Sequence, residues 1–101
     1  MTKFQQYYQQ MWDQHKDLLS RFLDIHDAYK TNRIAHQQEF NEIGKQAREL
    51  MEEWDKRLCT QMEKGKNGVF SSKVSEKFWN EVKKDFPLIE MVGVQIVHAG
   101  Q

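Results

Sequence analysis

Apolar residues recur at helical spacing through most of the chain between Phe4 and Met62. The series is Phe4, Tyr8, Met11, Leu18, Phe22, Ile25, Tyr29, Phe40, Ile43, Ala47, Leu50, Trp54, Leu58 and Met62. Its mean step of about 3.6 residues is the period of an α-helix. The pattern therefore predicts an all-α protein organised around this stretch.

The first predicted helix covers residues 3–30 and carries a wide apolar stripe. Tyr7, Trp12, Leu19 and Leu23 lie beside the main series and broaden it. A two-stranded coiled coil needs only a narrow seam, whereas a wide stripe indicates contact with two or more helices. One chain supplies a single other long helix, so we expect a homodimer whose hairpins complete a four-helix bundle.

Residues 30–33 decide between a hairpin and one helix of about sixty residues, a length far above the usual one. The absence of Gly and Pro there favours a continuous helix. Thr31 and Asn32, in contrast, are good N-cap residues. A fold at residue 31 also places residues whose numbers sum to 62 opposite each other, so that Phe22 meets Phe40. We therefore predict a long antiparallel hairpin.

The second predicted helix covers residues 33–64 and contains Gly44, which costs about 1 kcal/mol relative to Ala inside a helix. Two interpretations of this glycine stay open: a tolerated defect, or a point where another helix approaches closely. Gly65 ends the helix. A short third helix over residues 72–86 follows, and Pro87 stops it.

The helical domain, residues 1–87, is followed by an apolar C-terminal arm, residues 88–101. Val92, Val94 and Ile96 occupy alternate positions in it, which is typical of a strand. A lone strand is unstable, and an exposed apolar one aggregates. We therefore expect an extended arm that pairs edge to edge with a second copy or with another protein.

Composition narrows the classes of partner and compartment. Fifteen acidic and fifteen basic residues cancel, which argues against nucleic-acid binding and permits self-association. The single cysteine, Cys59, cannot form an internal disulfide, which favours a reducing compartment. Residues 1–4 have no apolar run, and the longest apolar stretch, 88–97, is too short to cross a bilayer. We expect a cytoplasmic protein without a membrane partner.

The histidines supply the one candidate for metal chemistry, because the common catalytic and phosphate-binding motifs are absent from the sequence. His26 and His36 sum to 62 and would lie level near the hairpin turn, with Glu39 one turn further on. Two imidazoles and a carboxylate suit Zn or Fe, and Asp27 lies close in sequence as a reserve ligand. The alternative is that both histidines are polar residues near a turn.

Two functional hypotheses follow. The first is a non-enzymatic interaction or assembly module without a cofactor, acting through its apolar helix face and its arm. Its predicted contact residues are Tyr8, Met11, Trp12, Leu19, Phe22, Leu23, Val92, Val94 and Ile96. The second is a Zn- or Fe-binding bundle with His26, His36 and Glu39 as ligands.

Overall fold

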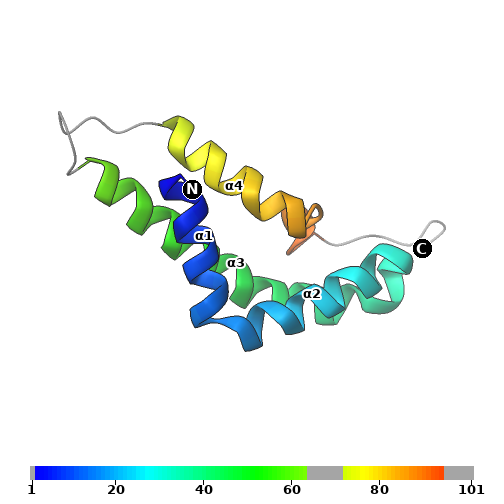
Figure 1. Cartoon of the computed structure of the whole chain (residues 1–101). Helices are drawn as coiled ribbons and strands as arrows, with labels where there is room; N and C mark the ends of the chain where they lie inside the picture. The colour runs from blue at the N-terminus through cyan, green and yellow to red at the C-terminus, as the bar shows by residue number, and fades with distance from the viewer. Residues whose placement is uncertain (1, 64–71, 95–101) are drawn as a thin grey trace.

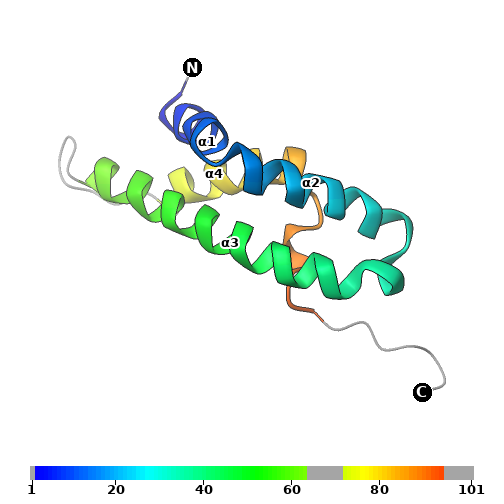
Figure 2. The same cartoon turned by 90° about the horizontal axis from the view of Figure 1, so that it is seen from below.

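The computed structural model describes residues 2–63 and 72–94, and these are helical almost throughout (Figure 1). The α-helices are α1 (Lys3–Gln14), α2 (Lys16–Thr31), α3 (Arg33–Glu63) and α4 (Ser72–Asp85), followed by the short 3₁₀-helix η2 (Ile89–Met91). The prediction of an all-α chain is confirmed for this part of the protein. Helix α3 is the longest element, and the other helices pack along it (Figure 2).

Helices α2 and α3 form the predicted antiparallel hairpin. Asn32 separates them in an extended conformation, with φ −149° and ψ 92°, and its Oδ1 accepts a hydrogen bond from the Ala35 N–H at 3.1 Å. This bond caps the start of α3. The rings of Phe22 and Phe40 lie 5.6 Å apart between centroids. The predicted register is thus confirmed at this pair, and one continuous helix of about sixty residues is excluded.

The prediction of one helix over residues 3–30 is wrong at His15. The backbone breaks there, with φ −129° and ψ 37°, and α1 turns away from the line of α2 (Figure 1). The break costs few hydrogen bonds, because the His15 N–H donates to the Met11 carbonyl and the His15 carbonyl accepts from the Leu19 N–H, both at 3.0 Å. The bend lets α1 pack against both α3 and α4.

The chain covers its own wide apolar stripe. Tyr8, Met11, Leu19 and Phe22 are buried within the protomer, and Trp12 and Leu23 pack partly buried against the same core. Helix α4 occupies a place that we expected a second copy to fill: its Phe78 meets Tyr8 edge to face. The width of the stripe therefore has an explanation within one chain, and the dimer stays a prediction.

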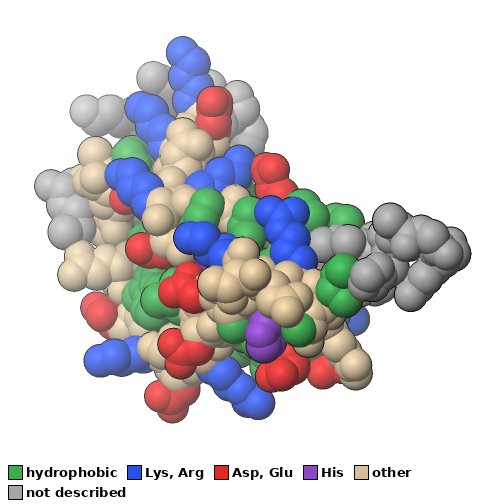
Figure 3. All heavy atoms as spheres, turned by 90° about the vertical axis from the view of Figure 1, so that its right-hand side faces the viewer, with side chains coloured by type: hydrophobic (Ala, Val, Ile, Leu, Met, Phe, Trp, Pro, Cys, Tyr) green, Lys and Arg blue, Asp and Glu red, His purple; other side chains and the backbone are tan. Residues whose placement is uncertain are grey.

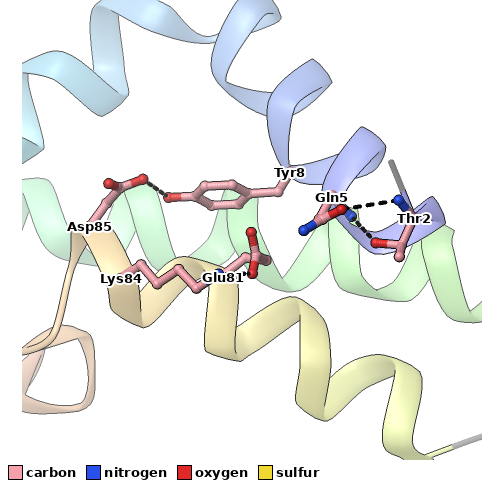
Figure 4. A network of polar contacts seen from close by, with 6 residues as sticks. All are labelled: Thr2, Gln5, Tyr8, Glu81, Lys84 and Asp85. Atoms are coloured by element: carbon pink, nitrogen blue, oxygen red, sulfur yellow. Dashed lines mark hydrogen bonds and ion pairs between the residues drawn. The ribbon is translucent and has the colours of Figure 1, made fainter.

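A polar contact joins α1 to the end of α4 (Figure 4). The buried Tyr8 hydroxyl donates a hydrogen bond of 2.7 Å to Oδ2 of Asp85. Burial raises the pKa of the Tyr8 phenol above its ordinary value, and the Asp85 carboxylate raises it further. At the start of α1, Thr2 and Gln5 exchange the two hydrogen bonds of a capping box.

Replacing Tyr8 with Phe is expected to lower the free energy of unfolding by about 0.5–1.5 kcal/mol at neutral pH, because one hydrogen bond is lost. The raised pKa adds a pH dependence: the folded state keeps the phenol proton above about pH 10, where an unfolded tyrosine loses it. The stabilisation is complete below that pH and declines above it. Urea titrations at about pH 8 and about pH 11 should therefore show the wild-type advantage shrinking at the higher pH.

Tyr7→Phe is the matched control for this experiment. Tyr7 is half-buried on the same helix, and its ring meets Trp54 edge to face, a contact that phenylalanine keeps. Its stability is expected to stay close to that of the wild type. An identical difference between wild type and Tyr8→Phe at both pH values would contradict the linkage.

Candidate functional site

The segment that follows α4 returns across the α2–α3 hairpin. We call residues 86–94 the C-terminal strap. Local hydrogen bonds turn it: the Ile89 N–H donates to the Phe86 carbonyl at 3.0 Å, and the Met91 N–H donates to the Leu88 carbonyl at 2.9 Å. The strand predicted for the arm is therefore wrong over the described part, where the strap contains the 3₁₀-helix η2.

Gly44 forms the notch in which the strap lies. A Cβ at this position would lie 2.7 Å from Val92 Cγ2 and 3.1 Å from Phe22 Cε1. Val92 is only 7% exposed. Gly44 is thus a point of close approach, but the element that approaches most closely is the strap and not the helix that the sequence suggested.

Asn41, one turn before Gly44 on α3, holds the last described residues of the strap. Its Oδ1 accepts from the Gly93 N–H at 2.9 Å, and its Nδ2 donates to the Val94 carbonyl at 3.4 Å. Gly93 has φ +86°, a conformation that glycine adopts without strain. The Asn41 side-chain amide thus bonds the strap backbone at two points. The sequence did not single out Asn41. The one signal is that this polar residue directly follows Phe40 of the apolar series.

His26 holds the other end of the strap and is completely buried. Its Nε2 accepts a hydrogen bond from the Leu88 N–H at 3.2 Å, and its Nδ1 lies 3.2 Å from Oδ1 of Asp27. A neutral imidazole with its proton on Nδ1 satisfies both contacts, donating to Asp27 and accepting from Leu88. The rings of Phe22, Phe40 and Phe86 surround it at centroid distances of 6.0, 6.1 and 5.7 Å.

The structure does not bring the predicted metal ligands together. His26 points into the aromatic core and has a partner at each nitrogen, whereas Glu39 is exposed and His36 half-buried at the start of α3. Within residues 2–63 and 72–94, no group of three His, Cys, Asp or Glu side chains is placed to hold a metal ion. The Zn or Fe hypothesis therefore has no ligand set in this part of the chain.

The predicted interaction residues divide into buried and exposed ones. The predicted residues on α1 and α2 belong to the protomer's own core or pack against it, and Val92 belongs to the core as well. Val94 is 42% exposed, and Ile96 lies outside the described residues. Ile34, which sequence reasoning missed, is 51% exposed at the start of α3. It lies seven residues before Asn41, and thus on the same helix face at a distance of about 10 Å along the axis.

A surface groove of about 450 Å³ runs between the strap and α3. Val92 and Gly93 form one wall, and Asn41, Lys45 and Arg48 belong to the other. Figure 3 shows the end of the molecule that lies to the right in Figure 1, where hydrophobic surface is interrupted by side chains of both charges. The groove itself is lined by side chains of both charges, since Glu42, Glu49 and Glu52 accompany Lys45 and Arg48.

Comparison with family models, curated proteins and solved structures finds no match for this chain. In the part that the structure describes, no helix has both the length and the apolar character needed to cross a bilayer.

Proposed function

We propose that this protein is a non-enzymatic assembly module that binds a second copy of itself through its C-terminal arm and the adjacent end of the hairpin. The observation that carries the proposal is the change in exposure along the strap. Ile89 and Val92 are 2% and 7% exposed, whereas Val94, whose carbonyl accepts from Asn41, is 42% exposed. The apolar sequence continues beyond it with Ile96 and Val97.

Ile34 is a second exposed apolar side chain, nearer the hairpin end. It shares a helix face with Asn41, which bonds the backbone of Val94. In a symmetric dimer the same surface contributes twice, so a small apolar area is doubled. The net charge of zero gives little repulsion between copies.

The polar groups of the site support a structural role over catalysis. Both hydrogen-bonding atoms of the Asn41 amide contact strap backbone, whereas His26 contacts it through Nε2 and lies against Asp27 through Nδ1. A general base or nucleophile needs such atoms to be available to a substrate. The role of these two side chains is thus to hold the strap, Val94 included, against the hairpin.

Sedimentation equilibrium tests the proposal. The wild-type chain at micromolar concentration is expected to give twice the 12.2 kDa chain mass. Val94→Asp is expected to give the mass of one chain, because an unpaired carboxylate is costly to bury in an interface. Gln9→Asp is the control, since it adds the same charge on the exposed face of α1 and should leave the dimer intact. A wild-type protein that stays monomeric throughout would refute the proposal.

A further inference from the structure

We infer that His26 is a pH-dependent latch, and that protonation of its imidazole releases the C-terminal strap while the helices stay folded. The latch bond is the one from the Leu88 N–H to His26 Nε2. A protonated imidazole carries hydrogen on both nitrogens. Nε2 would then carry a hydrogen and could no longer accept the Leu88 N–H. Flipping the ring would not restore the bond, because Nδ1 carries a hydrogen too.

The Leu88 N–H depends on this acceptor. Pro87 has no N–H, and the Phe86 N–H already donates to the Val82 carbonyl at 2.8 Å. Leu88 is thus the first backbone donor after α4 and Phe86, and it lies in a partly buried turn. An unpaired backbone donor in such a place destabilises the turn that holds it.

The surroundings of His26 oppose a charge when the strap is docked. The ring is completely buried; α3 contributes Phe40 to its surroundings, and the first residue of the strap, Phe86, lies against it as well. On its own helix the ring meets Phe22, and Tyr29 stacks on the same Phe40 at 3.9 Å. Release of Phe86 and Leu88 would admit water to the imidazolium, so the released state accommodates the charge better.

The nearby carboxylates do not cancel this difference. Asp27 contacts the ring but follows His26 on α2, and its side chain is 63% exposed. It therefore accompanies His26 whether or not the strap is docked. On the strap, Glu90 pairs with Lys83 at 2.9 Å, and the hydrogen bond from Lys83 lowers the pKa of the Glu90 carboxyl. That ion pair consequently persists through the range in which histidines titrate.

The sign of the effect follows from linkage. The docked strap requires neutral His26, whereas the released strap accepts either form, so release takes up a proton. Docking therefore weakens as the pH falls. The coupling of one proton limits the change to about tenfold per pH unit.

Amide hydrogen exchange followed by NMR measures the latch, on samples diluted until sedimentation shows a single chain. Between about pH 7.5 and about pH 5.5, exchange corrected for its intrinsic rate should become more than about tenfold faster at Leu88 and Val92. Amides in the middle of α3, such as that of Met51, should keep their protection. Unchanged strap protection in the wild type would overturn the inference.

His26→Gln keeps a neutral acceptor and cannot take up a proton, so its strap protection should not depend on pH. His36→Gln is the matched control and should keep the wild-type dependence. Should the His26→Gln variant fail to dock its strap at all, the wild type decides: the ring signals of His26 must titrate together with strap opening. Strap opening while His26 stays neutral, or a pH dependence retained in His26→Gln, would refute the latch.

The latch can be tested without the proposed function, because the exchange experiment uses single chains. Its consequence for assembly does rest on that function: the strap carries Val94, which the proposed dimer buries, so acid release would also weaken the dimer. A chain that never dimerises would leave the exchange result unaffected.

Discussion

Replacing Phe22 with Ala is expected to lower the free energy of unfolding by about 3–5 kcal/mol, the usual cost of removing a buried phenylalanine ring. Phe22 is completely buried, and its ring stacks on Phe86 at 5.0 Å and lies 5.6 Å from Phe40. It therefore joins α2, α3 and the start of the strap. Small domains have only about 5–15 kcal/mol in total, so this variant should be close to unfolding at ambient temperature.

Guanidinium titrations followed by circular dichroism measure this loss. Ile34→Ala is the control, on samples diluted until sedimentation shows a single chain: it also removes a large apolar side chain, but from a position that is 51% exposed in the single chain, and its effect should stay within about 0.5 kcal/mol. A loss below about 1 kcal/mol for Phe22→Ala would contradict the central place of this ring. Strap amides should lose protection in Phe22→Ala as well, since Phe22 also borders the Gly44 notch.

The helices and the hairpin could be predicted because their causes are local. A period of about 3.6 residues follows from helix geometry and is visible in any window of the sequence. The turn was legible from Asn32, whose side chain caps α3 in the way its residue type favours. The register then followed from the position of the turn, and the pair of Phe22 and Phe40 obeys it.

The bend at His15 was not predictable, because its cause lies far along the chain. The apolar period runs through the bend, and the backbone hydrogen bonds on either side of His15 are kept. The bend is favoured by the contacts that α1 makes with α4 and with the start of the strap: Tyr8 bonds Asp85 of α4, and Trp12 stacks on Phe86 at 5.8 Å. The sequence showed an apolar face on the third helix but not which surface it would cover.

The predictions of a strand in the arm and of a metal site were wrong for related reasons. For the metal site, residues that are level in a hairpin do not necessarily face each other. His26 lies one turn after Phe22 and faces the core, whereas Glu39 immediately precedes the buried Phe40 and faces solvent. The same lack of long-range information affected the arm. Alternating apolar residues suggested a strand, but Val92 is buried because Gly44, distant in sequence, leaves room for it.

Gly44→Ala is expected to destabilise the protein although it improves helix propensity. The gain in propensity is about 1 kcal/mol. Against it, the new Cβ would lie 2.7 Å from Val92 Cγ2 and 3.1 Å from Phe22 Cε1. Because Phe22 is held in a ring stack, the strap must give way, and overpacking of this kind costs about 1–3 kcal/mol. We expect a net loss of free energy of unfolding together with faster amide exchange at Val92.

A double-mutant cycle with Val92→Ala separates the clash from other effects. Val92→Ala alone removes two buried methyl groups and should cost about 1–3 kcal/mol. In the double variant the Cβ added by Gly44→Ala occupies space that the Val92 methyl groups leave, so the two losses should be less than additive by about 0.5–3 kcal/mol. Gln46→Ala, on the exposed face of α3, controls for propensity. Strict additivity, or a stabilising Gly44→Ala, would mean that the strap does not depend on the notch.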